Sequence, residues 1–497
     1  MRLRNRAAIL MFSNAMTQAT TLVVGIILVR LISRAEYGTF RQATAFYVFL
    51  AALLAAELET YLLYLIPRNP AAVRRPLLAQ SLLAETLVAG AMCLMLSLGA
   101  HLAAQRFNNP DLVPLLHILA LLPFFDRVLA MLQVYMIAMD AAQWSALYSL
   151  LGAVGKAAVT VGVVATGGSL AAVLTGHVIL VAAVAVSALV HAFALSGGGR
   201  FHLDRGLIAE AFRYTYPLYL TGMAYTIVLQ FDKLIASAFS DPGTFALYAV
   251  GALSLPVVPV VVNSMTSATL PPMVKMVSEG QDAEALALWQ EGMRKCSLVV
   301  FPCFAFFLVA GRDFIILLYG QAYEQSAWVF RVYLALLPLQ VAAFGSIFRA
   351  KGRTREIAVA TGIGAVVSTV VGILLTWAGG GTWIGFVGPA VGVWTGYALF
   401  VCILTVRMAR LVNVSLSAVL AWRELAASLA LSLAVAAPLG VLTLAPMPIP
   451  IRLVASACLY PLLLALAAWR FNALRDDEKR LIRSALRLCL FWRRTDG

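Results

Sequence analysis

Charged residues are scarce in this chain. Asp, Glu, Lys and Arg make up 12% of its 497 residues, and hydrophobic residues make up 62%. An ordinary soluble domain has roughly 25% charged residues, so the composition excludes that class and predicts an integral membrane protein. Acidic residues are the scarcer of the two signs, 23 against 37 Lys and Arg. In a membrane protein a basic excess is typical of cytoplasmic loops, so we expect no nucleic-acid partner.

Cysteine and histidine are also few, six and five in number. The sequence has no CxxC or HExxH pattern, so we predict no metal site, and it gives no reason to expect a cofactor. No glycine-rich turn opens a helix after a strand, and the loops expected outside the membrane are too short to hold a sugar and its catalytic carboxylates. The absence of any such signature argues against an enzyme and favours a transporter.

Long apolar runs dominate the rest of the sequence. A membrane span needs about 20 apolar residues, and about fourteen runs meet that criterion. These predicted spans lie near residues 7–32, 43–66, 77–103, 112–139, 141–166, 170–195, 207–239, 245–273, 296–319, 327–348, 357–377, 383–408, 425–444 and 453–470.

A short repeat indicates how the spans are grouped. Gly38-Thr39-Phe40 and Gly243-Thr244-Phe245 each follow a long apolar run, about six helices apart. We therefore predict an all-α membrane protein with two six-helix lobes related by pseudo-two-fold symmetry, plus two C-terminal helices. The predicted divisions are an N-terminal lobe at 1–195, a cytoplasmic linker at 196–206, a C-terminal lobe at 207–408, two extra transmembrane helices at 409–470 and a basic cytoplasmic tail at 471–497.

Basic residues set the predicted orientation. With the N-terminus inside, most Lys and Arg of the short loops fall on the cytoplasmic side, and the even number of spans brings both termini there. The exception is the first outer turn, which carries Arg30, Arg34 and Arg41. Residues 278–295 and 476–494 are amphipathic, and we predict that they are interfacial helices on the cytoplasmic side.

Polar residues recur at helical spacing in three spans, and each set forms a stripe on one face. Such stripes suit the wall of a water-filled cavity, although polar residues and glycines also mediate helix packing in lipid, and both interpretations stay open. The stripes are Asn14, Gln18, Thr21 and Gly25; Trp144, Tyr148, Gly152 and Lys156; and Tyr214, Thr221, Tyr225 and Asp232.

Ionisable residues inside apolar spans are costly and often functional. Four cations, Arg127, Lys156, Lys233 and Arg331, are spread over four spans from both halves. Acidic residues accompany them, and Asp126 could pair with Lys156 while Asp232 pairs with a cation of another helix. A cavity between the halves would instead concentrate the cations. Further acids in the early spans are Glu57, Glu59 and Glu85.

Three motifs carry a family resemblance. They are LVRLISRAEYGTFRQ at residues 28–42, the FDKLIASAF and GTFALYAVGAL segments within 231–253, and LLYGQAY at 317–323. In this order they resemble the oligosaccharide flippase family of the multidrug/oligosaccharidyl-lipid/polysaccharide exporter superfamily, over roughly the first 410 residues. The resemblance implies a two-lobed bundle whose central cavity opens to the two sides of the membrane in turn.

The implied cargo is a polyprenyl-diphosphate-linked oligosaccharide. It would move from the inner to the outer leaflet of the bacterial inner membrane for O-antigen, capsule or exopolysaccharide assembly, alongside membrane lipids and polymerase or export machinery. A diphosphate loses tens of kcal/mol of hydration in hydrocarbon, and Lys and Arg can replace that hydration. The predicted binding residues are Arg127, Lys156, Lys233, Arg331, Trp144, Tyr148, Tyr214, Tyr225, Asn14 and Gln18, and the candidates for energy coupling are Glu57, Asp126 and Asp232.

Other functions remain open. A drug/cation antiporter of the same superfamily would have an acidic cavity, and a polytopic glycosyltransferase or polymerase would need an outer domain. Relatives that flip the peptidoglycan precursor carry arginines on the first and eighth spans, where this chain has Asn14, Gln18 and Asn263. That departure speaks against the peptidoglycan precursor as cargo.

Overall fold

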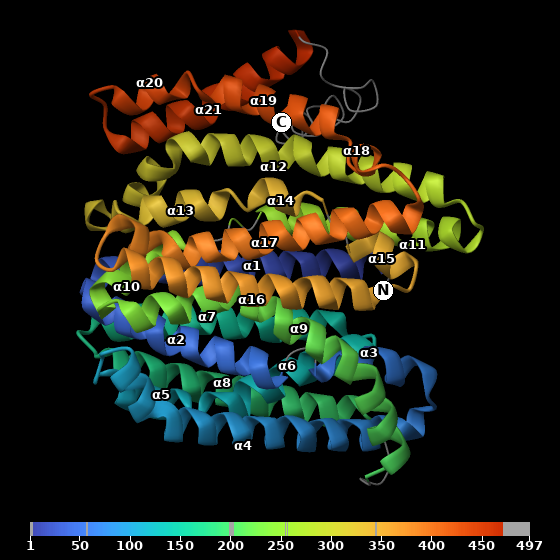
Figure 1. The fold of residues 1–497 in the computed structure, drawn as a ribbon. Helices are drawn as coiled ribbons and strands as arrows, with labels where there is room; N and C mark the ends of the chain where they lie inside the picture. The colour runs from blue at the N-terminus through green and yellow to red at the C-terminus, as the bar shows by residue number, and fades with distance from the viewer. Residues whose placement is uncertain are drawn as a thin grey trace, which may run out of the picture. The chain divides into compact units, whose positions relative to one another are not determined.

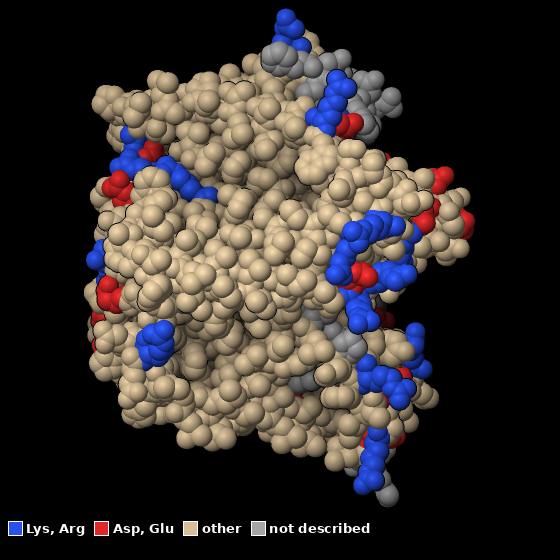
Figure 2. All heavy atoms as spheres, in the orientation of Figure 1, with Lys and Arg blue, Asp and Glu red and all other residues tan. Residues whose placement is uncertain are grey.

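A computed structural model describes residues 3–55, 58–197, 203–253, 255, 257–342 and 345–470. All regular secondary structure in these residues is helical, which confirms the predicted all-α class (Figure 1). In Figure 2 the charged side chains gather at the ends of helices, and surface without charged residues runs between them. This is the distribution that a bilayer requires, because the hydrocarbon layer solvates charge poorly.

Ten helical segments are long and apolar enough to cross a membrane, counting only the described residues. They correspond to ten of the predicted spans. The segments are α1 (Leu3–Leu31, apolar from Phe12), α4 (Arg74–Arg106), α5 (Leu112–Leu119) with α6 (Leu122–Ala138), α7 (Ala142–Ala165), α8 (Leu170–Leu195), α12 (Asp282–Tyr319), α16 (Thr354–Gly379), α17 (Trp383–Val412), α19 (Trp422–Ala436) with α20 (Leu439–Leu444), and α21 (Ile449–Arg470).

The other four predicted spans are divided or charged. The 207–239 span is one continuous helix, α9 (Arg205–Phe239), whose apolar sequence is interrupted by the charged residues Asp232 and Lys233. The other three are built from shorter pieces, so none of them is a single apolar rod. The pieces are α2 (Arg34–Ala55), η1 (Leu58–Thr60) and α3 (Tyr61–Leu65); α10 (Pro242–Gly251) and α11 (Val257–Ser278); and α13 (Ser326–Leu334), α14 (Leu337–Gln340) and α15 (Gly345–Ala350).

One predicted interfacial helix is wrong. Residues 282–295 are the first turns of α12, which continues without a break to Tyr319. Ala285 and Trp289 in these turns are buried, so the apolar face packs against protein rather than lying on a lipid surface. No proline lies between Asp282 and Cys296, so the backbone hydrogen bonds continue from these turns into the span. The other predicted interfacial helix, 476–494, lies outside the described residues.

The chain forms two compact units. Unit 1 comprises residues 1–253 and 355–400, and unit 2 comprises residues 254–354 and 401–497. The predicted lobe boundaries at 195 and 207 stay a prediction. In unit 1 a large buried cluster joins α4, α5, α6 and α8, and its members Leu116, Met131 and Tyr135 are fully buried.

In unit 2 the long helix α12 holds the C-terminal hairpin, α19 to α21. In the first half of α12, Arg294 Nε lies 3.4 Å from Glu424 Oε2. Toward its C-terminal end, Arg452 Nη2 donates to buried Asp313 Oδ1 over 2.8 Å. The hairpin is therefore fixed to α12 at two levels by charged groups.

The two copies of the Gly-Thr-Phe repeat lie side by side, because α2 and α10 pack against each other within unit 1. A Cβ atom on Gly38 would lie 1.8 Å from the carbonyl oxygen of Pro242, so only glycine allows this approach. Both helices begin with a cap: Ser33 and Glu36 bond each other's backbone N–H, and Asp241 accepts from the Thr244 N–H. Hydrogen bonds from Ser33 lower the pKa of Glu36.

Candidate functional site

Arg127 of α6 lies between two carboxylates. Its Nη2 donates to Glu59 Oε2 over 2.7 Å, and its Nε donates to Glu85 Oε2 over 3.2 Å. The three side chains are 13%, 19% and 2% exposed. A buried guanidinium between two glutamates is held by its partners, since removing it would leave their charge uncompensated in a poorly solvating environment. In this conformation Arg127 is therefore committed to linking η1, α4 and α6.

Lys156 of α7 forms a much looser pair. Its Nζ lies 3.6 Å from Asp126 Oδ1, and the two side chains are 37% and 36% exposed. The pairing of these two residues, one of the alternatives predicted from the sequence, is present. Tyr47 of α2 donates a hydrogen bond of 3.1 Å to the other oxygen of Asp126. Exposed ion pairs of this kind contribute little, so the Lys156 ammonium remains available to another anion.

Lys156 lies on the face of α7 that is directed toward other helices of unit 1. Leu147, Leu151, Val154 and Val161 are exposed aliphatic residues of this helix, and helical rotation places them on the side opposite Lys156. The face of Lys156 also carries Ser149, which is hydrogen-bonded to Thr17 of α1. Lys156 is therefore half-exposed on a face that turns away from the lipid.

Helix α1 runs beside α7 in the same direction. Ser13 donates to the carbonyl oxygen of Ala146 over 3.0 Å, and one turn later Thr17 and Ser149 share a hydrogen bond of 3.1 Å. The contacts advance together along both helices, so the two helices are parallel. Lys156 lies farther along α7 in the same direction.

The predicted polar stripe of α1 is exposed. Asn14 and Gln18 are open at the molecular surface. Phe12, Met16 and Val23 are also exposed, and helical rotation places them nearly opposite the stripe. The helix therefore has one exposed apolar face, which suits acyl chains, and one exposed polar face, which suits water.

Trp144 and Tyr148 connect α7 to α8. The Trp144 ring meets His191 edge-on with 4.3 Å between centroids, and it is 40% exposed. Tyr148 is buried, and its hydroxyl donates to the carbonyl oxygen of Ser187 over 3.3 Å. The face of Tyr148 is thus not open to a sugar in this conformation, whereas part of Trp144 is.

On α9, Asp232 and Lys233 form an ion pair within one helix, with 3.5 Å between Nζ and Oδ1. Asp232 is buried, and Tyr248 of α10 donates to its Oδ2 over 2.6 Å. Lys233 also donates to the Leu229 carbonyl oxygen over 3.1 Å. This cluster fastens α9 to α10, the helix that packs against α2.

The remaining predicted residues lie apart from this group. Tyr214 is half-buried and stacks on Tyr64, while Tyr225 is 50% exposed on the same helix. Arg331 belongs to unit 2, where its guanidinium carbon lies 5.0 Å from the centroid of the Trp328 ring. The other three cations belong to unit 1, so a meeting of all four in one cavity stays a prediction. Glu57 lies outside the described residues.

Two tyrosines of these clusters were not anticipated from the sequence. Tyr47 supports Asp126, and Tyr248 supports Asp232. Each is an isolated phenol inside an apolar run, and that isolation was the only available signal, because a buried hydroxyl needs a partner. Among the described residues, no group of three or more His, Cys, Asp or Glu side chains is arranged to hold a metal ion.

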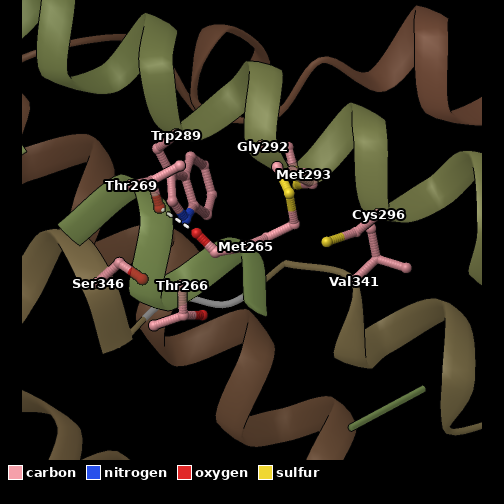
Figure 3. Close-up of a pocket in the computed structure, with 9 residues that line it drawn as sticks. All are labelled: Met265, Thr266, Thr269, Trp289, Gly292, Met293, Cys296, Val341 and Ser346. Atoms are coloured by element: carbon pink, nitrogen blue, oxygen red, sulfur yellow. Dashed lines mark hydrogen bonds between the residues drawn. The ribbon is translucent and has the colours of Figure 1, made fainter. Parts of the chain in front are cut away.

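A small recess lies in unit 2 between α11, α12 and the segment around α15 (Figure 3). Met265, Trp289, Met293 and Cys296 give it a largely apolar, sulfur-rich lining. The recess has a free volume of about 10 Å³, room for about one water molecule, so it is too small for a lipid-linked sugar. None of the residues predicted to bind substrate lines it.

Comparison with solved structures defines the class of fold. Lipid II flippase MurJ in its inward closed conformation has a TM-score of 0.69 and 11% identity, covering 93% of this chain and 99% of that one. An inward-facing multidrug resistance MATE family transporter of the MOP superfamily has a TM-score of 0.66 and 13% identity, covering 80% and 94%. A MOP superfamily transporter from Pyrococcus furiosus has a TM-score of 0.57 and 12% identity, covering 82% and 94%.

The fold is therefore that of the MOP superfamily of membrane transporters. Residues 3–277, more than half of the chain, match the model of the polysaccharide biosynthesis protein family. The chain belongs to that family. No curated protein sequence matches it.

Proposed function

We propose that this protein is a flippase, not an enzyme, that carries a polyprenyl-diphosphate-linked oligosaccharide from the cytoplasmic to the outer leaflet by alternating access. The bacterial inner membrane is the proposed location, with both termini cytoplasmic. Membership of the polysaccharide biosynthesis family and the transporter fold support the proposal. Its product would be assembled into O-antigen, capsule or exopolysaccharide by polymerase and export machinery.

Lys156 is the observation that carries the proposal. It is a half-exposed cation on the face of α7 that turns away from lipid, about two helical turns beyond Ser149, which contacts Thr17 of α1. An ammonium in a hydrated recess can replace water around a diphosphate with charge-assisted hydrogen bonds. Asn14 and Gln18 can hydrogen-bond sugar hydroxyls, and Trp144 offers part of an aromatic face.

Asp126 holds Lys156 while no substrate is bound. The arriving diphosphate competes with this single carboxylate for the ammonium, and the exposed pair is weak enough to exchange. Tyr47 keeps Asp126 in place after the exchange. Arg127 and Lys233 then have structural roles, while Arg331, in the last turn of α13, serves the outer side. For energy coupling, Asp126, Asp232 and Glu57 remain proposed residues.

The test is the variant Lys156→Gln in proteoliposomes with a synthetic polyprenyl-diphosphate oligosaccharide. Exposure of the sugar to an external glycosidase measures flipping. We expect at least a tenfold loss of rate, because the charged partner of the diphosphate is gone. Lys156→Arg retains the charge and should keep most of the rate. Wild-type flipping by Lys156→Gln, with unchanged protein stability, would remove Lys156 from the site.

A drug/cation antiporter is the second candidate, and the charge balance around α6 favours it. Glu59, Glu85 and Asp126 supply three carboxylates, against two cations, Arg127 and Lys156. A surplus carboxylate suits a cationic cargo or a proton. Expression that protects cells against cationic dyes, together with absence of lipid flipping in proteoliposomes, would decide for this candidate.

A further inference from the structure

An arginine and two tyrosines form a stack at one end of unit 1. Tyr64 of α3 lies parallel to Tyr214 of α9, with 4.5 Å between ring centroids and 18° between planes. The guanidinium carbon of Arg68 lies 4.1 Å from the centroid of the same Tyr64 ring. Two flat groups cannot both occupy one face of a ring at these distances, so Arg68 and Tyr214 take opposite faces. Tyr214 is thus the end layer of a three-layer stack.

The stack fixes the orientation of the Tyr214 ring. Arg68 also donates a hydrogen bond to the Tyr64 hydroxyl, which holds the middle layer in place. Tyr214 itself is half-buried, and no second ring or cation stacks on it in the part of the chain that the structure describes. Part of a rigidly held aromatic surface is therefore open to a ligand, which reduces the entropy lost on binding.

The stack lies at the basic end of unit 1. Arg68 is close in sequence to Arg74 and Arg75, and Arg75 donates to Ser196 at the start of the segment that leads to α9. Gln80 donates to the Asp204 carbonyl oxygen at the end of that segment. Short basic segments favour the cytoplasmic side, and they attract anionic headgroups there.

We propose that Tyr214, positioned by Tyr64 and Arg68, is a cytoplasmic docking surface for the first sugars of the lipid-linked glycan. This inference rests on the proposed flippase function. A pyranose ring has an apolar face of C–H groups that packs on an aromatic ring, while its hydroxyls stay in water. The arginines at the same end of unit 1 attract the diphosphate that follows the sugar.

A second aromatic pair on α9 gives a matched control. Phe212 and Tyr216 stack on each other with 5.5 Å between centroids, and they are 67% and 49% exposed. Helical rotation places both on the side of α9 opposite Tyr214. Their depth is the same as that of Tyr214, as expected for tyrosines and phenylalanines at a membrane interface. They therefore separate a sugar contact from a general interfacial role.

The experiment measures equilibrium binding to purified full-length protein in nanodiscs. The probes are a polyprenyl diphosphate carrying a tetrasaccharide and the same polyprenyl diphosphate without sugar. For Tyr214→Ala we expect about three- to tenfold weaker binding of the tetrasaccharide lipid and unchanged binding of the bare lipid. Tyr214→Trp should retain the affinity. The Phe212→Ala/Tyr216→Ala double variant should bind both lipids as the wild type does.

Each outcome decides a different point. The docking surface is overturned if Tyr214→Ala weakens both lipids equally, if it weakens neither, or if the control pair reproduces its effect. Thermal stability of each variant is measured in the same nanodiscs, and Tyr214→Leu, which removes the aromatic face but keeps a bulky side chain, replaces the alanine variant if that variant does not fold. A wild-type protein that binds neither lipid would instead overturn the proposed function.

Discussion

Two consecutive residues of α6, Asp126 and Arg127, differ in burial and in ion pairing. Arg127 is nearly buried and donates to Glu59 and Glu85, with a shortest contact of 2.7 Å. Asp126 is half-exposed and only loosely paired with Lys156 at 3.6 Å. The same helix therefore places Arg127 in a buried ion-pair network and Asp126 in an ion pair that solvent and ligands can reach. The difference separates a charge used for folding from a charge available to a ligand, although both lie in the same apolar run.

Replacing Arg127, the buried charge, should have the largest effect, a loss of protein stability. Arg127→Met leaves Glu59 and Glu85 facing each other without a cation, and a broken buried network of this kind costs about 3–5 kcal/mol. We expect little folded protein, measured as the monodisperse fraction after extraction and as Tm. The triple variant Glu59→Gln/Arg127→Met/Glu85→Gln should recover most of the stability. A stable Arg127→Met protein would show that the two pairs do not differ as described.

Removing Asp126, the partner of Lys156, should have a smaller effect, and it should strengthen ligand binding rather than weaken it. Asp126→Asn frees Lys156 from its carboxylate, whose exposed pairing is worth about 0.2–1 kcal/mol. The affinity for a polyprenyl diphosphate should rise, by up to about fivefold, with Tm nearly unchanged. Binding in nanodiscs provides the measurement, and Asp126→Glu serves as the control. Weaker binding by Asp126→Asn would mean that Asp126 contacts the ligand favourably.

Removing a tyrosine hydroxyl beside either ion-pair network should have the smallest effect on stability. Tyr47 donates to half-exposed Asp126, whereas the Tyr61 and Ser81 hydroxyls are buried together at 2.7 Å. Water can replace the Tyr47 hydroxyl at half-exposed Asp126, so Tyr47→Phe should cost under about 1 kcal/mol. Tyr61→Phe should cost about 1–1.5 kcal/mol, because buried Ser81 loses the Tyr61 hydroxyl but keeps its bond to the Leu77 carbonyl oxygen. Thermal unfolding in nanodiscs compares them. An equal cost would indicate equal access of water to both sites.

Much of the fold follows from the sequence. Charge scarcity and apolar run lengths predicted an all-helical membrane protein, and ten of the runs are helical segments long enough to span. The runs that break into α13, α14 and α15, or into α10 and α11, were not predicted as broken. Hydropathy averages over a window, and it does not resolve where neighbouring helices satisfy an interrupted backbone.

The candidate site was predicted less completely. The spacing of Asn14 and Gln18 placed them on one face of α1, and both are exposed there. Trp144 and Tyr148 also follow a helical spacing, yet both contact α8 through His191. Periodicity identifies residues that share a face, but the neighbour that covers this face comes from another part of the chain.

The sequence by itself determined the membrane class, the family and the residues that bring charge into the apolar spans, because composition and local order carry that information. Only the tertiary structure decided which charges are buried in ion-pair networks and which are exposed and loosely paired. Glu59 and Glu85 lie 68 and 42 positions from Arg127 along the chain. The rotation of each packed helix brings such distant groups together or exposes them, and in hydrocarbon every charge is held by whichever partner that packing provides.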